Sequence, residues 1–535
     1  MNERLIQRGF WSINAVLGTL ILLRAILGPD SPPLHMKSPM DTQSCLGLAF
    51  VLVLAARARW GREAACNLPA LRPFCLGAVA LILLAAAAFG HTIGFYFLSD
   101  DFVLVKAGNS LRSGIGTVFA AETGYGFYRP ITRLALAVES TWAQWDPVAW
   151  HLSALILHLA NSLLVYVLSL RFCSSRFAAF FASALFLIHG TRPETAVWIA
   201  GRFDLLATFF VLCGLIFFIR SLDLAGPSRF RALAFALLSM SLAILSKESA
   251  YIFPLLLVLF LFCERGSLSG QIGSVLPFFL VSAALFAQRL LLYGGIGGYR
   301  DPRVGSSGIV TADVMSALNA LTLRIWGALF FPVNWSIEPG AFFAFFLAAY
   351  LITLVGLAAG RIPRSRLAFT LGFVLIAVIP PLHLLKIGSD LEKSRFLYLP
   401  SIGFCLMMAL ASERLRGRMP RIIPAVVLIF NLFALDHNLK AWRYASDKAR
   451  SSAAAAVKCI EPTTKQLIAA GLPATLNGVY FWGNGFPEMV GMQLKGAGIS
   501  VELRQEKNLP INSDGSRWLI WDRALHELRC LIPQR

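Results

Sequence analysis

The stretch GFYFLSDDFVLVKAG, residues 94–108, places two adjacent acids, Asp100 and Asp101, at the end of an apolar run that begins at Phe74. An apolar run of about 20 residues is long enough to cross a bilayer as a helix. The two acids therefore mark the point where a predicted membrane helix gives way to polar sequence. Solvation of a helix end would explain either acid alone, so the pair by itself leaves its role open.

The composition of the whole chain indicates the class of protein. Of its 535 residues, 57% are hydrophobic and 14% are charged, and the mean hydropathy is +0.67. A soluble domain carries roughly 25% charged residues, so much of this surface is expected to face lipid. We predict an all-α polytopic membrane protein, because a membrane barrel would show short alternating segments instead.

About 13 apolar stretches are predicted as membrane helices, although the second is short for a bilayer. They lie near residues 10–28, 44–57, 73–93, 149–170, 175–189, 203–220, 232–246, 250–263, 272–292, 341–360, 367–386, 396–412 and 422–436. The stretch 319–337 is also apolar, but counting it as a span would move two arginine-rich loops to the outer face. We therefore expect it to lie in the membrane interface or to re-enter the membrane.

The net charge of +19 comes largely from arginines in short loops between the spans. These loops contain Arg57, Arg59, Arg62 and Arg72; Arg171 and Arg176; Arg220, Arg229 and Arg231; Arg361, Arg364 and Arg366; and Arg414, Arg416, Arg418 and Arg421. One topology places all of them in the cytoplasm, as the positive-inside rule requires. It puts the N-terminus inside, and the acidic pair and everything after about residue 437 outside. The charge thus indicates orientation rather than a nucleic-acid partner.

The expected domain organisation has three parts. Residues 1–72 hold additional N-terminal membrane helices, residues 73–436 form the main membrane domain with a first outer loop at 94–148, and residues 450–535 form a small extramembrane α/β domain. In that last domain we expect strands in GVYFWG (478–483), GISVELR (498–504) and RWLIWDR (517–523), and a helix over 486–498. Cys459 and Cys530 fall there too, and a disulfide and two free thiols fit the sequence equally well.

Charged residues recur at the outer ends of the predicted spans, and a single face that collects acids and bases suggests a shared cavity. Carboxylates serve as general bases, and Arg and Lys suit a phosphate. Together they predict group transfer from a lipid-linked phosphate to an acceptor outside. Purely structural roles also stay open for single residues. Arg129 would then be an interfacial anchor, and Lys247 and Glu248 a local ion pair. No metal-ligand spacing is present, although an acid-rich loop would accept a divalent ion.

Five motifs follow one another in the chain. They are FLSDDF (97–102), the segment 128–168 that begins YRPITRL, HGTRPETAVWIAGRFDLLATFFVL (189–212), SKESA (246–250) and SRFLYLPSIGFCL (394–406). In this order they resemble the GT-C superfamily of membrane glycosyltransferases, and most closely its protein O-mannosyltransferase-like branch, typified by the transmembrane-and-TPR-containing mannosyltransferases and their bacterial relatives. The resemblance covers about residues 75–412.

The resemblance implies a role for each matching residue. Asp100 would be the base on the acceptor hydroxyl, with Asp101 beside it. The donor phosphate would contact Arg129, Arg395, Lys247 and Tyr398, and the supporting acids would be Glu194 and Glu248. The implied activity is an inverting transfer of a sugar, a mannose-like hexose, from a polyprenyl-phosphate donor to a protein or glycolipid. The implied location is the bacterial inner membrane, with the C-terminal domain in the periplasm.

The sequence also departs from the family pattern. Ser394 stands where a glutamate usually precedes the arginine, His189 is followed by glycine rather than proline, and a small α/β domain replaces the TPR repeats. These differences affect the acceptor more than the donor. Three rival interpretations stay open: a transferase directed to lipid A or an O-antigen precursor, a non-enzymatic polyprenyl-lipid flippase, and a scaffold with degenerate motifs whose tail binds a partner. The intact Asp100, Arg129 and Arg395 count against the scaffold.

Overall fold

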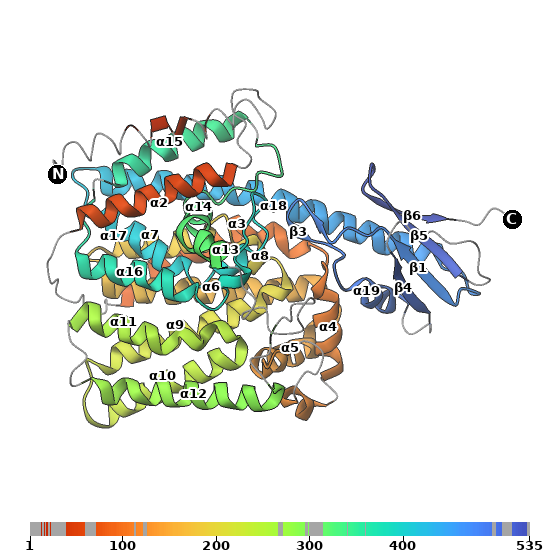
Figure 1. Cartoon of the computed structure of the whole chain (residues 1–535), viewed down its shortest axis with the longest axis horizontal. Helices are drawn as coiled ribbons and strands as arrows, with labels where there is room; N and C mark the ends of the chain where they lie inside the picture. The colour runs from red at the N-terminus through yellow and green to blue at the C-terminus, as the bar shows by residue number, and fades with distance from the viewer. Residues whose placement is uncertain are drawn as a thin grey trace.

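A computed structural model describes residues 39–58, 71–111, 114–120, 126–265, 271–294, 298, 314–339, 341–358, 360–494, 499–504 and 516–531, with isolated positions between 12 and 22. Figure 1 shows a body of helices, from one end of which α18 (Met419–Cys459) runs out to a small sheet. The predicted span at 10–28 lies largely outside the described residues.

Helices and short helical turns (η) make up the body. In chain order they are α2 (Pro39–Arg57), α3 (Leu71–Phe89), η1 (Gly90–Gly94), α4 (Asp100–Leu111), η2 (Ile115–Phe119), α5 (Pro130–Ala143), α6 (Pro147–Phe172), α7 (Arg176–Ile188), α8 (Pro193–Ala196), η3 (Ile199–Gly201), α9 (Arg202–Ser221), α10 (Gly226–Ser246), η4 (Glu248–Ile252), α11 (Phe253–Arg265), α12 (Ile272–Tyr293), α13 (Val314–Asn319), η5 (Ala320–Arg324), α14 (Ile325–Phe330), α15 (Ala341–Leu357), α16 (Arg364–Ala377), η6 (Leu382–Leu384), η7 (Ser394–Leu397), α17 (Ser401–Glu413) and α18.

The chain is a mostly helical membrane protein. Among the described residues, six helices are long and apolar enough to cross a membrane: Cys75–Gly94, Pro147–Phe172, Ile199–Ser221, Gly226–Ser246, Ile272–Tyr293 and Met419–Cys459. Several other predicted spans are shorter helices. The predicted span 367–386, for example, is α16, which ends at Ala377 just before Pro380 and Pro381 because proline cannot continue a helix. The total of about 13 spans stays a prediction.

The helix α17 lies at the centre of the body. Every residue from Ser401 to Ser412 is buried, and the helix packs between α7, α16 and α18. A side chain at Gly403 would place its Cβ 2.5 Å from the carbonyl oxygen of Thr370, so glycine lets α16 and α17 approach closely. Small residues at such contacts are typical of membrane helix packing.

The apolar stretch 319–337 is helical as far as Phe330, and this helix packs on α2. The segments α13, η5 and α14 run on from one another over residues 314–330. A Cβ on Gly47 of α2 would lie 2.7 Å from the carbonyl oxygen of Trp326, so this glycine allows the two helices to touch. Its position in the membrane interface, or its re-entry into the membrane, stays a prediction.

The described residues of the predicted first outer loop form two helices, α4 and α5, and the short turn η2. Both helices lie at the same end of the body as the sheet (Figure 1). Proline at position 130 opens α5, where its fixed φ suits the first helical turn. Ser140 of α5 donates a hydrogen bond of 3.0 Å to the carbonyl oxygen of Gly108 in α4. An ion pair of 2.6 Å between Glu139 and Arg202 fixes α5 to α9. The loop therefore presents the start of α4 in a defined position.

The C-terminal domain follows directly after the long helix α18. Residues 425–461 contain neither glycine nor proline, and α18 continues through them for 41 residues in all, about 60 Å at 1.5 Å per residue. The domain then contains β1 (Gln466–Ala470), β2 (Thr475–Leu476), β3 (Val479–Tyr480), α19 (Phe486–Gln493), β4 (Ser500–Arg504), β5 (Ser516–Asp522) and β6 (Glu527–Leu531).

The main sheet has the order β4-β1-β5-β6, in which β1 runs parallel to β4 and β5 while β6 is antiparallel to β5. The predicted strands at 498–504 and 517–523 are confirmed as β4 and β5. The stretch 478–483 supplies only the two residues of β3, which pair with β2 in a separate hairpin. The predicted helix ends at Gln493, before the predicted glycine stop. A disulfide between Cys459 and Cys530 joins the end of α18 to β6. Of the two alternatives left by the sequence, a disulfide or two free thiols, the structure therefore has the disulfide.

Candidate active site

The two adjacent acids diverge at the start of α4. Successive helical residues are rotated by about 100°, so Asp100 and Asp101 meet different neighbours. Asp101 is 1% exposed, and its carboxylate accepts hydrogen bonds from the backbone N–H groups of Leu98 (3.0 Å) and Ala200 (3.2 Å). Burial raises the pKa of Asp101 well above its usual range, and these N–H groups only partly oppose the effect. Asp101 is thus held within the fold.

Asp100 is half-buried and faces the C-terminal domain. Its Oδ1 accepts a hydrogen bond of 2.7 Å from the side-chain amide of Asn484. Within the described part of the chain, its Oδ2 has no hydrogen-bond partner, so this oxygen is available to an incoming hydroxyl. The same described ranges contain no group of three His, Cys, Asp or Glu side chains placed to hold a metal ion.

Glu194 joins two motifs that lie 200 residues apart in the chain. Its Oε2 accepts hydrogen bonds from the Ser394 hydroxyl (3.1 Å) and the Arg395 backbone N–H (3.3 Å), and Oε1 lies 3.5 Å from the Arg395 guanidinium. Ser394, which replaces the usual glutamate, therefore contributes a hydroxyl donor here. Burial raises the pKa of Glu194 to about 7, although the Arg395 guanidinium lowers it.

The raised pKa of Glu194 predicts a pH dependence of stability. A carboxyl that holds its proton more tightly in the folded state stabilises the protein fully below its ordinary pKa of about 4.5, and this contribution is lost as the pH rises through about 7. We expect the free energy of unfolding to fall between pH 5 and pH 7, and Glu194→Gln to flatten that slope. Thermal unfolding in detergent across this pH range measures it. An unchanged slope in the variant would assign the titration to another group.

Arg395 lies in an aromatic enclosure. Its guanidinium carbon is 4.7 Å from the ring centre of Trp198, 5.2 Å from that of Phe396 and 5.3 Å from that of Tyr480. Trp198 stacks on Tyr480 and donates its indole N–H to the carbonyl oxygen of Leu98 at 3.2 Å. Leu98 also donates its backbone N–H to Asp101. Trp198 therefore links Asp101 to Arg395 through Leu98.

The SKESA motif forms a turn in which two charges are paired from other elements. The Lys247 ammonium lies 2.6 Å from a carboxylate oxygen of Asp204, and both side chains are buried. Glu248 accepts two hydrogen bonds from the guanidinium of Arg129, at 2.9 Å and 2.5 Å. Burial raises the pKa of Glu248, but Arg129 outweighs it and the pKa falls to about 2. The structure thus brings Arg129 from the first outer loop to this turn.

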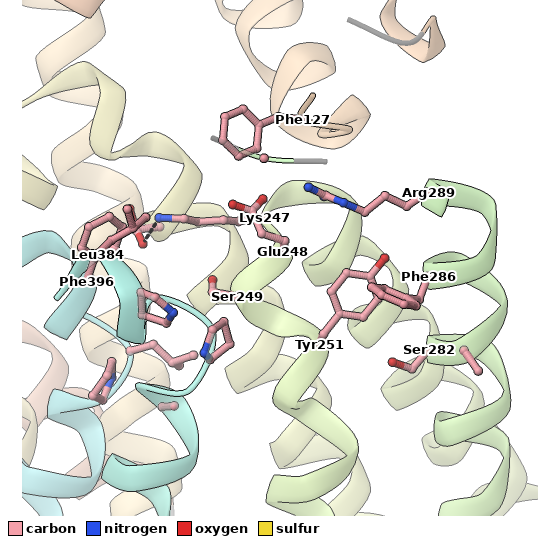
Figure 2. A pocket seen from close by; sticks show the side chains of 18 of the residues that line it. Phe127, Lys247, Glu248, Ser249, Tyr251, Ser282, Phe286, Arg289, Leu384 and Phe396 are labelled. Atoms are coloured by element: carbon pink, nitrogen blue, oxygen red, sulfur yellow. Dashed lines mark hydrogen bonds and ion pairs between the residues drawn. The ribbon is translucent and has the colours of Figure 1, made fainter. Parts of the chain in front are cut away.

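A cavity of about 500 Å³ adjoins the turn. Figure 2 shows its charged groups, among them Lys247, Glu248 and Arg289, at one end near Phe127. The remaining wall is mostly apolar and aromatic, and includes Tyr251, Phe279, Phe286, Pro380, Leu384 and Phe396. A cavity with a charged end and an apolar body fits an amphiphile with an anionic head group.

Two charged residues that line this cavity, Arg289 and Asp204, are not among the site residues predicted from the sequence. Arg289 of α12 donates a hydrogen bond of 3.3 Å to the carbonyl oxygen of Gly126, and its guanidinium points toward Glu248 (Figure 2). Asp204 holds Lys247, as described above. Asp204 lies near the start of α9 and Arg289 near the end of α12, two helices long enough to cross a membrane. A charge in such a position is a signal of function that the sequence already offered.

Tyr398 is placed differently from the other predicted phosphate ligands. It is fully buried, and its hydroxyl lies 2.7 Å from Nδ1 of His158 and accepts a hydrogen bond of 3.2 Å from Asn161. It is not among the described residues that line the cavity. Its contacts hold the 394–398 turn against α6. Arg395 is likewise not among the described residues that line the cavity. Its guanidinium lies 5.2 Å from the ring centre of Phe396, which does line it and lies 5.1 Å from the Lys247 ammonium.

Comparisons with known proteins agree with this architecture. No protein-family model matches the chain. It is 25% identical over 378 residues to protein O-mannosyl-transferase TMTC4 of Homo sapiens, a match that covers 58% of this chain and 51% of that protein. It is 23% identical over 325 residues to protein O-mannosyl-transferase F38B6.6 of Caenorhabditis elegans, covering 56% of this chain and 44% of that protein. The chain therefore spans about half the length of these curated relatives.

A solved structure shares the fold. ArnT from Cupriavidus metallidurans bound to undecaprenyl phosphate superposes with a TM-score of 0.52 at 12% identity, covering 83% of this chain and 93% of that chain. At this identity the likeness concerns the fold alone. The chain is thus similar in fold to ArnT and distantly similar in sequence to the protein O-mannosyl-transferases, in agreement with the GT-C resemblance of its motifs.

Proposed function

We propose that this protein transfers a sugar, a hexose such as mannose, from a polyprenyl-phosphate donor to an acceptor hydroxyl at the outer face of the membrane. The observation that carries the proposal is the cavity beside the SKESA turn, which combines a charged end with an apolar body. The ArnT structure, which has the same fold, holds undecaprenyl phosphate. A polyprenyl phosphate has the two parts that this cavity would accommodate.

The geometry of α12 supports a direction for the donor. The helix has 22 residues, about 33 Å at 1.5 Å per residue, which matches a hydrocarbon core of about 30 Å. A phosphate beside Arg289 and Lys247 would leave the polyprenyl tail to follow α12 past Phe286. A second apolar cavity of about 130 Å³ shares Phe279 with the first and continues to Ile272 near the opposite end.

The proposed chemistry is a direct displacement with inversion. Asp100 accepts the proton of the acceptor hydroxyl through Oδ2 as that oxygen forms a bond to the anomeric carbon. The bond from this carbon to the phosphate oxygen breaks, and polyprenyl phosphate leaves. Lys247, Arg129 and Arg395 stabilise the charge on the leaving phosphate. Glu248 and Glu194 hold Arg129 and Arg395 in place through the ion pairs described above.

We place the protein in a bacterial inner membrane, with the N-terminus in the cytoplasm and the C-terminal domain in the periplasm. The disulfide between Cys459 and Cys530 supports this orientation, because disulfides persist in oxidising compartments and are rare in the cytosol. The acceptor is a protein or a glycolipid, and a screen of both classes separates an O-mannosyltransferase from a transferase directed to lipid A or polysaccharide.

The function is tested with the purified full chain and a set of polyprenyl-phosphate hexoses. Release of polyprenyl phosphate together with a glycosylated acceptor is the expected result. Donor binding without turnover, combined with movement of the donor between the leaflets of a vesicle, would favour the flippase interpretation instead. The absence of binding to every polyprenyl phosphate would contradict the proposal.

Arg289→Gln is expected to weaken donor use by about 10- to 100-fold, since a hydrogen bond to a charged group contributes about 1.5–3 kcal/mol. The loss should appear as a higher KM for the polyprenyl-phosphate sugar. Arg220→Gln is the matched control, because Arg220 is an exposed arginine in the last turn of α9, far along that helix from Asp204. Equal KM values for both variants would remove Arg289 from the donor site.

A further inference from the structure

A short loop of the C-terminal domain, Trp482–Gly485, docks on the start of α4. Trp482 stacks on Phe102 with ring centres 5.6 Å apart and planes 24° apart. Gly485 has a left-handed φ of 83°, and a Cβ there would lie 2.1 Å from the carbonyl oxygen of Ser99. Only glycine satisfies both conditions. The loop therefore has a fixed position beside the acidic pair.

Asn484 lies within this loop and is itself exposed. Its side-chain amide donates the 2.7 Å hydrogen bond to Oδ1 of Asp100, across 384 residues of sequence. An exposed hydrogen bond between two side chains adds little to stability, because water replaces it readily. Docking of the loop already rests on Trp482 and Gly485. The contact of Asn484 with Asp100 thus bears on the orientation of that carboxylate rather than on folding.

The C-terminal domain also contacts Arg395. Tyr480, four residues before Asn484, stacks on Trp198 and lies over Arg395. Its hydroxyl donates a hydrogen bond of 3.2 Å to Glu392. One segment of the C-terminal domain therefore contacts both the proposed base and a proposed phosphate ligand. This arrangement is expected of a domain that completes an active site.

We propose that Asn484 is a positioning residue for Asp100, so that the C-terminal domain is a working part of the active site. This inference rests on the proposed function. The amide of Asn484 occupies Oδ1 and fixes the plane of the carboxylate, which leaves Oδ2 directed at the acceptor hydroxyl. A displacement of about 1 Å in a reacting group can cost about 100-fold in rate. Loss of this single hydrogen bond therefore affects turnover far more than stability.

Asn484→Ala is expected to lower kcat by about 10- to 100-fold, with the donor KM and the melting temperature unchanged. Asn484→Asp has the same shape without the donor and should lose at least as much. Asn484→Gln keeps the amide and should recover part of the activity. Glu488→Gln is the control, because it removes the exposed contact of Glu488 with Lys106 at the same interface and leaves Asp100 untouched. All four are measured in the full chain with a polyprenyl-phosphate sugar.

The outcomes separate this inference from the proposed function. Wild-type kcat in Asn484→Ala overturns the positioning role, even if Asp100→Asn is inactive. A fall in melting temperature in Asn484→Ala with kcat unchanged also overturns it, since the loop would then act in docking alone. Full turnover in Asp100→Asn overturns the base assignment itself. Losses in Asn484→Ala and Asp100→Asn that combine less than additively support the inference, because residues acting through one another are coupled.

Discussion

Asp100→Asn is expected to lower the rate of sugar transfer by about 10²- to 10⁴-fold, the contribution of a positioned general base. Asparagine has the shape of aspartate but cannot accept the acceptor proton. Since Asp100 is half-buried at the edge of the fold and Asn484 is its hydrogen-bond partner, stability should hardly change. The measurement is the release of polyprenyl phosphate under single-turnover conditions, together with donor binding, which should be retained.

Two further variants sharpen this test. Asp436→Asn replaces an aspartate of α18 whose side chain is 65% exposed and should leave transfer intact. Asp101→Asn should instead impair folding, because one of the backbone N–H groups of Leu98 and Ala200 would face an amide NH2 group rather than an oxygen. If Asp100→Asn turns over normally while Asp101→Asn is well folded and inactive, the two acids have the opposite roles.

The second large effect is expected at the buried ion pair between Lys247 and Asp204. Asp204→Leu leaves the Lys247 ammonium without its partner, which costs about 3–5 kcal/mol of stability for a buried pair, and it should abolish transfer. The double variant Lys247→Met with Asp204→Leu should regain most of that stability, because apolar replacement of a buried ion pair is often neutral. Transfer should stay strongly reduced, since Lys247, one of the cations proposed to stabilise the leaving phosphate, is absent.

A second buried ion pair provides the control. Arg366 and Glu264 lie 3.0 Å apart at the opposite end of α11 from the SKESA turn. Glu264→Leu should also destabilise the protein, and Arg366→Met with Glu264→Leu should restore both stability and transfer. Thermal unfolding and donor turnover are measured on all four variants. Normal transfer in the Lys247→Met, Asp204→Leu protein would show that Lys247 serves folding alone.

The sequence could predict the parts of the site but not how they meet. Asp100 and Asp101 are recognisable as a pair at a membrane edge, yet their divergence depends on where α4 begins, and one residue of shift would exchange their neighbours. The contact of Arg129 with Glu248 joins segments 119 residues apart, which no local pattern encodes. Tyr398 belongs to the same motif as Arg395, and its burial against His158 follows only from tertiary packing.

The fold shows the same division. The long apolar runs indicated the membrane helices, because length and hydropathy are properties of a single segment. The strands β1 and β6 were not predicted, since QLIAA at 466–470 lacks alternation and ELRCL at 527–531 carries charges at an edge of the sheet. The absence of glycine and proline after residue 436 indicates that α18 continues. The sequence becomes more polar at that point, however, and this change favoured a helix end there.

The loop Trp482–Gly485 also sets the order in which the protein matures. Asp100 leaves the ribosome 384 residues before Asn484, the residue that contacts it from this loop. An unfinished or truncated chain can insert its membrane helices but lacks Asn484 and Tyr480 at the site. Under the proposed function, activity is therefore expected only once the C-terminal sheet has folded and this loop has docked on α4.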